Sequence, residues 1–580
     1  MLKFLIISLV ILSGVFLPLT AQTTPSELIV EGRWVNPPSH DPGIPSEIYN
    51  KNMPAVEYQD ATVPPQPPVR MCAEWEPAVS VLIRYPLGLP WDLVEDLAQD
   101  VHVTCLVSSS NYSSAQSQFN SHGISPSQVD FVITNTNTYW TRDYGPWFVF
   151  DGQDTIGISD HVYNRVDTHG RIYDDQSNWY LAPALGVELW KTDLRHTGGN
   201  FMCDGHGVGM SSDDVYNYSF NSTITQDSVN NLMNAYWGIH TYHAFPDPLG
   251  SYIDHIDCYA KFLNEEKIVV ITNGVDDYNL NQVANQISGL TGCFGEDYQV
   301  VRLHCPDNHD AAYVNCLIVN SFVYLPLTGY YDEDTAAIHF YERELPGYTV
   351  KGYQDYSFEP TDAIHCRTKA IYDPGMLYVD VNPHVDTTDL KVKALVHDYN
   401  GMGVKTDSVF LVWRFAGDSL FTNFELMDQI SGFPDSFQAY LPLPVSEETL
   451  SVDYYVFAAD NSGRHATDPY TAPGGYYNID YEVMGIEEGT EHIVPPERIA
   501  IYQQNNKLVF TSSAGLQNIE EISIMDITGR IRSEINRHLI PAGGNIIILD
   551  LDRLDLTSGI YLITVKTDQN NYTDKINIIR

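Results

Sequence analysis

Residues 268–303 carry the pattern that decides the fold of the larger part of this chain: IVVIT at 268–272, DYNLNQVANQISG at 277–289 and VVRL at 300–303. The outer two segments are short apolar runs, which are typical of buried strands, and the middle segment has a helical pattern. The order is therefore strand, helix, strand. This alternation predicts an α/β fold.

The same alternation extends over residues 70–376. Val79–Ile83 and Val101–Val107 are predicted to be buried strands, with a helix over Trp91–Gln99 between them. Val314–Leu325 adds a hydrophobic strand pair around Asn320-Ser321. The units are irregular, so the pattern alone fits either a doubly wound sheet or a ring of repeated units.

Length and charge narrow the class of protein. A chain of 580 residues with 43% apolar and 18% charged residues predicts a folded, multidomain protein. The 75 acidic and 31 basic residues give a formal net charge of −44. A field of that sign repels phosphate backbones and anionic lipids. We therefore expect binding neither to nucleic acid nor to a membrane surface.

The N-terminus is typical of an exported protein. Lys3 precedes an apolar run over Phe4–Leu19 and the small exit Thr20-Ala21, which predicts a cleavable signal peptide over residues 1–21. The apolar run is shorter than the ~20 residues that cross a bilayer. Residues 22–69 are proline-rich and are expected to form an extended leader.

All eight cysteines precede residue 370. In an oxidising compartment an even number favours pairing, but the density is low for a disulfide scaffold, so one or more free thiols are expected. The sequence contains no CxxC or His-x-x-x-His pattern, so we expect no metal site.

The helical signal fades after residue 376. Alternating segments bounded by turn residues predict a β-sandwich over 377–482, followed by a polar linker at 483–496 and a small all-β domain over 497–580. The chemistry is therefore expected upstream of these two modules.

Two segments of the α/β region place an acid in a ligand-like setting. In TRDYGPW, residues 141–147, Asp143 lies among aromatic side chains, a setting that suits a delocalised cation. The second segment is HTGGNFMCDG, residues 196–205, in which two adjacent glycines indicate close backbone approach, to a ligand or within a tight turn. Each motif alone also fits a structural loop.

Two further segments carry an imidazole and a thiol. In an extended chain His255 and Asp257 project to the same face, which would place an imidazole beside a carboxylate. Cys366 lies between His365 and Arg367, an electropositive neighbourhood that favours thiolate.

A thiolate, an imidazole and paired carboxylates discriminate among reactions. Acyl transfer has no use for paired carboxylates, whereas attack on a guanidinium carbon does. Two carboxylates can grip the N–H edges, a thiolate can attack the central carbon, and a histidine can protonate the departing ammonia.

In this order and spacing, TRDYGPW, HTGGNFMCDG, HIDC and TDAIHCRT resemble the Porphyromonas-type peptidylarginine deiminase family, relatives of agmatine deiminase among the guanidino-group-modifying enzymes. The resemblance covers about residues 55–375. It implies a five-bladed α/β propeller, the pentein fold, for residues 70–376, and an Ig-like sandwich is expected after it.

Carried over by residue, the resemblance implies roles for individual side chains and no cofactor. Cys366 matches the nucleophile, His255 the general acid/base, and Asp143 and Asp257 the carboxylates that grip the guanidinium. Asn315 matches a further active-site amide. The resemblance also implies three substrate-side residues, namely Trp140, Arg165 and Asp204.

One loop departs from the family pattern. Where the family carries Asn-Arg-Pro-Arg, with two arginines that meet the substrate's terminal carboxylate, this chain reads Asn164-Arg165-Val166-Asp167. Asp167 would repel that carboxylate, so substrates without it are expected to be tolerated or preferred, and an internal arginine should match or exceed a C-terminal one, unless Arg171 takes the place of the second arginine.

The C-terminal module resembles the sorting domain of type IX secretion, around Ile524–Arg530 and Ser558–Tyr561. We therefore expect an enzyme that is secreted or held at the outer-membrane surface of a Gram-negative bacterium, with the secretion machinery as a partner. The predicted substrates are arginine-containing peptides or proteins, converted to citrulline. The alternatives are a small-molecule agmatine or arginine deiminase and a non-catalytic surface adhesin.

Overall fold

A computed structural model describes most of the chain after residue 60. The described residues are 61–274, 277–305, 313–387, 390–442, 450–481, 499–504, 507–512, 519–526, 530–536, 546–554, 556–557, 559–567 and 571–578. The predicted signal peptide, most of the proline-rich leader and the predicted linker lie outside these residues.

The strand and helix predictions in the α/β region are confirmed. The opening stretch forms β12 (Lys267–Thr272), α8 (Tyr278–Ile287) and β13 (Gln299–His304), and the two strands pair in parallel. Near the N-terminal end, β2 (Ala78–Tyr85), α1 (Trp91–Asp100) and β3 (Val103–Val107) repeat the arrangement, again with parallel strands. Apolar side chains of α1, including Leu93 and Leu97, are buried against this sheet.

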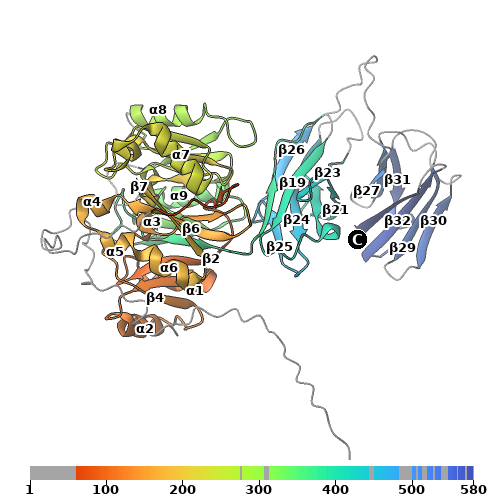
Figure 1. The fold of residues 1–580 in the computed structure, drawn as a ribbon. Helices are drawn as coiled ribbons and strands as arrows, with labels where there is room; N and C mark the ends of the chain where they lie inside the picture. Colours follow the sequence, from red (N-terminus) through yellow and green to blue (C-terminus); the bar gives the residue numbers. More distant parts are fainter. Residues whose placement is uncertain are drawn as a thin grey trace, which may run out of the picture. The chain divides into compact units, whose positions relative to one another are not determined.

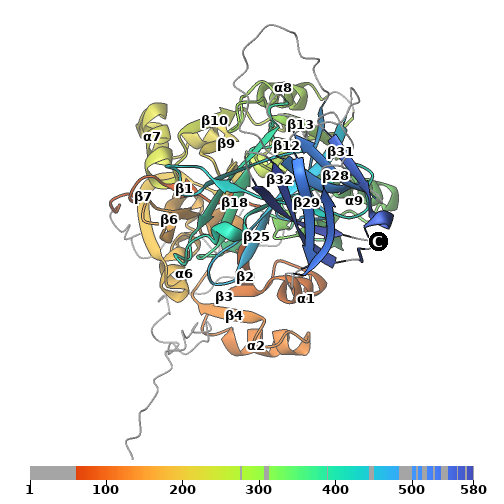
Figure 2. The ribbon, with the colours of Figure 1, turned by 90° about the vertical axis from the view of Figure 1, so that its right-hand side faces the viewer.

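The described part of residues 61–373 contains five small sheets rather than one continuous sheet (Figures 1 and 2). This excludes the doubly wound alternative, which requires one sheet. Five is the number that a five-bladed arrangement requires; the propeller itself stays a prediction. The sheets are β1 (Arg70–Met71)-β5 (Phe148–Phe150)-β6 (Ile156–Tyr163)-β7 (Glu188–His196), β10 (Thr241–Phe245)-β9 (Val208–Ser212)-β8 (Met202–Cys203), β11 (Ala260–Phe262)-β12-β13, β14 (Leu317–Val319)-β15 (Phe322–Leu327)-β16 (Thr349–Gln354), and β17 (Lys369–Tyr372)-β2-β3-β4 (Val129–Ile133).

The last strand of this region returns to the first long one. β17 pairs antiparallel with β2, with Lys369 opposite Leu82 and Ala370 opposite Val81. Because β17 begins three residues after Cys366, this pairing anchors the segment that carries the predicted nucleophile.

Residues after 376 form antiparallel sheets. The first two sheets enclose a core that includes Val392, Leu411 and Val452. They are β18 (Leu377–Val381)-β19 (Lys391–Asp398)-β23 (Ser436–Tyr440)-β22 (Asp428–Gln429) and β21 (Asn423–Leu426)-β20 (Phe410–Phe415)-β24 (Leu450–Ala459)-β25 (His465–Asp468), with β26 (Tyr477–Tyr481) paired to β24. The Ig-like topology stays a prediction. The C-terminal strands form two further sheets around Leu508 and Ile563. These are β27 (Ile499–Gln504)-β28 (Lys507–Ser512)-β31 (Ile546–Asp550) and β30 (Ile531–Asn536)-β29 (Ile519–Asp526)-β32 (Gly559–Thr567)-β33 (Asn571–Ile578).

Two global properties follow. None of the eight cysteines, all of which are described, forms a disulfide, so pairing is absent and free thiols are confirmed. Among the described helices none is long and apolar enough to cross a membrane.

Candidate active site

Five of the predicted residues line one pocket in the α/β region: Trp140, Asp143, Arg165, His255 and Cys366. They come from separate segments of the chain, so tertiary structure is needed to bring them together. The remaining lining residues are Arg171, Tyr252, Ile253, Thr361 and Asp362.

Asn315 and Asp257 hold the Cys366 thiol from behind. The Nδ2 of Asn315 donates to Cys366 Sγ at 3.3 Å, and its Oδ1 accepts from the backbone N–H groups of Ala363 and Cys366 at 3.1 and 3.2 Å. Cys366 Sγ lies 3.6 Å from Asp257 Oδ2. One amide thus positions both the thiol and the loop that carries it.

His255 lies between the two predicted carboxylates. Its Nδ1 is 3.7 Å from Asp143 Oδ1 and 4.0 Å from Asp257 Oδ1. The extended segment predicted for 255–257 is wrong beyond His255: residues Ile256–Cys258 form a short 3₁₀ turn, η4. The turn still keeps His255 and Asp257 on one side because the first residue is extended and the chain then folds back.

Gly199 explains the paired glycines of the second motif. A Cβ on Gly199 would lie 2.5 Å from His255 Nδ1 and 2.8 Å from Asp143 Oδ1. Both distances are far inside van der Waals contact, so any side chain there would displace the site. The close backbone approach is thus to the side chains of the site itself, and it is made by the short turn η1 (Gly198–Asn200).

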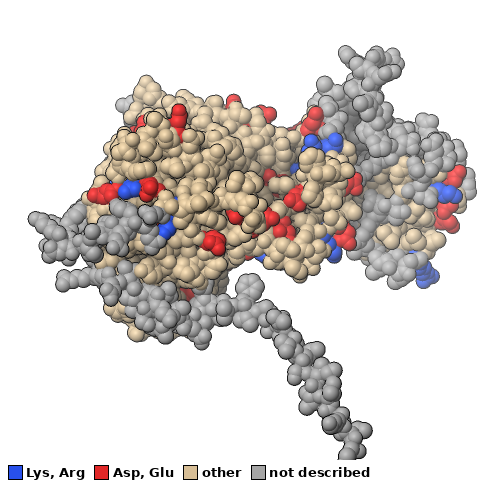
Figure 3. Space-filling model, viewed as in Figure 1, with Lys and Arg blue, Asp and Glu red and all other residues tan. Residues whose placement is uncertain are grey.

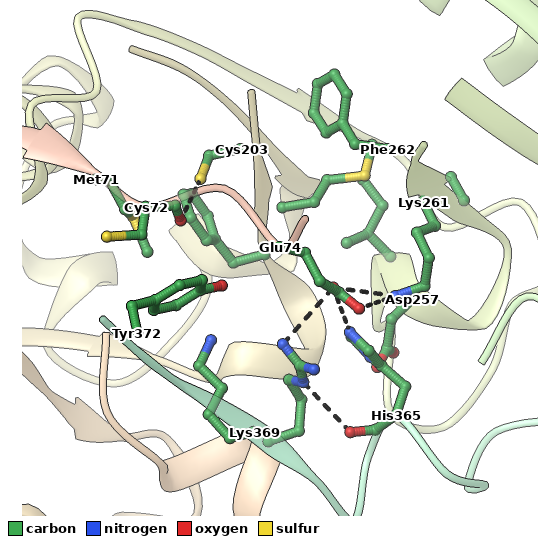
Figure 4. Close-up of a pocket in the computed structure, with 15 residues that line it drawn as sticks. Met71, Cys72, Glu74, Cys203, Asp257, Lys261, Phe262, His365, Lys369 and Tyr372 are labelled. Carbon is green, nitrogen blue, oxygen red and sulfur yellow. Dashed lines mark hydrogen bonds and ion pairs between the residues drawn. The ribbon is translucent and has the colours of Figure 1, made fainter. Parts of the chain in front are cut away.

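A series of buried, charged side chains extends from Asp257 through His365 to Glu74 (Figure 4). His365 Nδ1 lies 2.7 Å from Asp257 Oδ2, and His365 Nε2 lies 2.9 Å from Glu74 Oε2. Lys261 Nζ donates to Glu74 Oε1 at 3.0 Å, and Arg142 Nη1 lies 3.7 Å from Glu74 Oε2. Sequence reasoning missed Glu74 and Lys261. Glu74 lies far along the chain from the motifs, and Lys261 follows the HIDC segment by three residues but belongs to no charged pattern of its own.

The contacts of Asp257, Glu74 and His365 determine the protonation state of each. Burial raises the pKa of Asp257 and of Glu74, but His365 and Lys261, together with the other cations nearby, outweigh it, and both pKa values lie below their usual range. Burial and the charge of Arg142 lower the pKa of His365, while Glu74 and Asp257 oppose this. Only a ring that carries both protons donates to both carboxylates, so we assign an imidazolium.

The expected electropositive environment of Cys366 is not found. Burial raises the pKa of the thiol well above its usual value, and Asp257, Asp362 and Asp143 raise it further. Arg367 does not compensate, because its Nε and Nη2 each donate to Asp362 at 2.8 Å and its guanidinium lies 4.8 Å from the Tyr139 ring. Adjacency along the chain was misleading here.

Asp204 does not join the site. Its Oδ1 accepts the backbone N–H groups of His206 and Val208 at 2.8 and 2.9 Å, so it holds the turn between β8 and β9. Asp204 is also absent from the pocket lining. The structure therefore does not place Asp204 with the predicted substrate-side residues, because its carboxylate holds its own loop.

The loop over residues 164–167, which differs from the family pattern, does not direct its charges as expected. Asp167 is bound by Arg195 Nε at 3.1 Å and by the Ser219 hydroxyl, and it does not line the pocket. Arg171 does line it: its guanidinium lies 4.6 Å from the Trp140 ring, and its Nη1 donates to Tyr163 Oη at 2.9 Å. The repulsion expected from Asp167 therefore loses its basis.

Comparisons with known proteins match the α/β region and the C-terminal strands. The family model described as Porphyromonas-type peptidyl-arginine deiminase matches residues 70–371, and that of the secretion system C-terminal sorting domain matches residues 503–579. A putative agmatine deiminase of Legionella pneumophila (strain Paris) is 24% identical over 342 residues, which are 53% of this chain and 96% of that protein. An agmatine deiminase of Ectopseudomonas mendocina is 23% identical over 226 residues, 34% of this chain and 60% of that protein.

Two solved structures are similar at lower identity. The agmatine deiminase of Enterococcus faecalis is 18% identical with a TM-score of 0.49, covering 55% of this chain and 100% of that one. The putative arginine deiminase of Porphyromonas gingivalis is 19% identical with a TM-score of 0.47, covering 53% of this chain and 99% of that one.

Proposed function

The chain belongs to the Porphyromonas-type peptidyl-arginine deiminase family, and on that premise we propose that it is an exported enzyme that hydrolyses the guanidino group of peptidyl-arginine. The products are citrulline and ammonia, and the reaction passes through a covalent intermediate on Cys366. The C-terminal sorting domain supports export by the secretion machinery.

The observation that carries the proposal is a set of unsatisfied polar atoms around the thiol. Asp143 Oδ1 and both ring nitrogens of His255 are buried and have no hydrogen-bond partner among the described residues. Buried polar groups without partners are costly, and at functional sites they indicate a ligand. A guanidinium supplies the N–H donors that the carboxylate requires.

The steps assigned to these residues balance in protons. Cys366 loses its proton to His255, and the thiolate attacks the guanidinium carbon while Asp143 and Asp257 hold the N–H edges. His255 then gives its proton to the departing nitrogen, which leaves as ammonia. A thiouronium remains on Cys366. Water attacks this carbon and His255 takes one of its protons. The thiolate is then expelled, and the remaining hydroxyl proton leaves to solvent, where it converts ammonia to ammonium, so that citrulline is formed. His255 finally returns its proton to the Cys366 thiolate, which restores the free site. No step requires a metal or an organic cofactor.

The raised pKa of Cys366 gives the substrate a part in activating it. In the free site three carboxylates disfavour a thiolate. A bound guanidinium brings a positive charge next to the sulfur and offsets them. We therefore propose that the thiol ionises only when substrate is present, which protects the free thiol from oxidation outside the cell.

Arg165 and Arg171 shape the choice of substrate. Both line the pocket, and two cations there repel the ammonium end of agmatine and attract a carboxylate. Arg171 is only 3% exposed, so its charge is poorly screened. We therefore propose a peptide arginine, with a C-terminal arginine favoured over an internal one, and hold free arginine as the small-molecule alternative.

The test measures citrulline on four substrates: agmatine, free arginine, and one peptide with its arginine either internal or C-terminal. Cys366→Ala is expected to abolish turnover with every substrate, whereas Cys105→Ala, which removes a buried thiol in β3, should retain it. Activity of Cys366→Ala within tenfold of the parent would contradict the covalent mechanism. If the parent forms no citrulline from any of the four substrates, the adhesin alternative is favoured.

A further inference from the structure

A second cavity, the rear cavity, lies behind the pocket that Cys366 lines. The two linings share no residue, and Arg142, Asp257 and His365 lie between the two spaces. Its polar side is made by Glu74, Arg142, Lys261 and Lys369, and its apolar side includes Met71, Phe201, Met202, Ile256 and Phe262.

The charges around this cavity do not cancel within the protein. Of the two carboxylates that line it, Asp257 is engaged by His365 and Glu74 by Lys261 and His365. Arg142 Nη1 also lies 3.7 Å from Glu74, which Lys261 and His365 already engage. Two carboxylates therefore face four cationic groups, namely Arg142, Lys261, His365 and Lys369. Arg142 is only 3% exposed, and its Nη2 has no hydrogen-bond partner among the described residues.

Lys369 is the second such cation. Its side chain is 7% exposed and lines the cavity, and no hydrogen bond or ion pair joins it to any described residue. Figure 4 shows its amine pointing into the cavity, on the side of Tyr372 and away from Glu74. Burial, together with the charge of Arg142, lowers the pKa of Lys369 to about 7, although Glu74 opposes this shift. A buried ammonium beside a guanidinium is unfavourable without a negative partner.

Size and polarity define what that partner is. The cavity volume is about 40 Å³, and on this measure one water occupies roughly 10–15 Å³. A monatomic or very small polyatomic anion fits, whereas a substrate-sized carboxylate does not. The apolar half of the lining penalises strongly hydrated ions such as sulfate, because they would lose their hydration without replacement.

We propose that this rear cavity binds one small, weakly hydrated monovalent anion, of the chloride type, between Arg142 and Lys369. The surface does not favour such binding: the formal net charge is −44, and Figure 3 shows acidic side chains scattered over the visible face. Anion binding is therefore expected to be local to these buried cations rather than a general property of the protein.

The anion has two expected effects. It keeps Lys369 protonated, so the folded state gains stability when the ion is present. It also holds Arg142, whose Nε donates to the backbone carbonyl of His365 at 3.3 Å. The site thus supports the loop next to Cys366 without contacting substrate.

The first test measures thermal unfolding of the full chain in sodium chloride against sodium gluconate at equal ionic strength. For the parent we expect Tm to rise with the logarithm of the chloride concentration above Kd, by roughly 2–4 °C for a tenfold excess over Kd. Lys369→Met should lose this dependence. Lys405→Met, which removes a half-exposed lysine of the β-sandwich, should retain it.

The second test locates the ion. In crystals grown in sodium bromide, we expect an anomalous peak between Lys369 Nζ and Arg142 Nη2. Equal Tm in chloride and gluconate, an unchanged dependence in Lys369→Met, or a bromide peak elsewhere would each overturn the proposal and indicate a neutral lysine. Neither readout uses enzymatic activity, so the outcome is independent of the proposed function.

Discussion

His365 Nδ1 lies 2.7 Å from Asp257 Oδ2, and this contact joins the loop of Cys366, the proposed nucleophile, to the segment of His255, the proposed general acid/base. His365 immediately precedes Cys366, and Asp257 follows His255 by two residues. A single buried ion pair therefore couples the positions of all four groups. Both partners are 3% exposed, so the contact is poorly screened by solvent.

We expect His365→Gln to lower kcat by roughly 10- to 100-fold, the equivalent of one lost charge-assisted hydrogen bond. KM should change less, because His365 acts through Asp257 and does not touch substrate. His397→Gln is a matched control, since His397 Nδ1 also lies 2.7 Å from an aspartate, Asp435, in the β-sandwich. Steady-state kinetics check both variants, and an equal loss in the control would contradict a local positioning role.

Asp143→Asn and Asp257→Asn should each reduce kcat/KM by at least ~100-fold, because an amide presents a donor to a guanidinium donor. Asp204→Asn is the control, since an amide oxygen can still accept the two backbone N–H groups of its turn. Kinetics on one peptide substrate compare the three. Near-normal catalysis by either of the first two would mean that its carboxylate is structural.

Arg165→Ala should lower the preference for C-terminal over internal arginine by about tenfold, because it removes one of the two cations that line the pocket. Asp167→Asn should leave that ratio unchanged, since Asp167 is bound by Arg195 and Ser219 outside the pocket. The ratio of kcat/KM for the paired peptides measures both. A change caused only by Asp167→Asn would restore the interpretation drawn from the sequence.

Stability should fall in mild acid partly through His161. Burial lowers the pKa of His161 from 6.5 to about 3, so between these values the unfolded chain binds a proton that the folded chain does not. Stability is therefore lost as pH falls below 6.5, by about 1.4 kcal/mol per pH unit. Urea unfolding at pH 4.5–7.5 should show a shallower loss for His161→Gln. Parallel curves for the parent and the variant would disprove this contribution.

Much of the site was predictable because its motifs are local. Trp140 and Asp143 share one segment, His255 and Asp257 another, and Cys366 a third, and a reaction that needs a thiol with paired carboxylates limits the possibilities. Asp204 and Arg367 were misinterpreted for the same reason: a residue close along the chain to a motif can direct its side chain to its own loop.

The sequence by itself determined the alternation of strands and helices, the change to β structure after residue 376 and the chemical types at the site, since these depend on local periodicity and on side-chain identity. Only the tertiary structure decided which charges meet. Glu74 and His365 are 291 positions apart and Arg171 reaches the pocket while Asp167 does not. Such contacts depend on how separate sheets pack, and Coulomb interactions in a buried site depend on distances that no local pattern specifies.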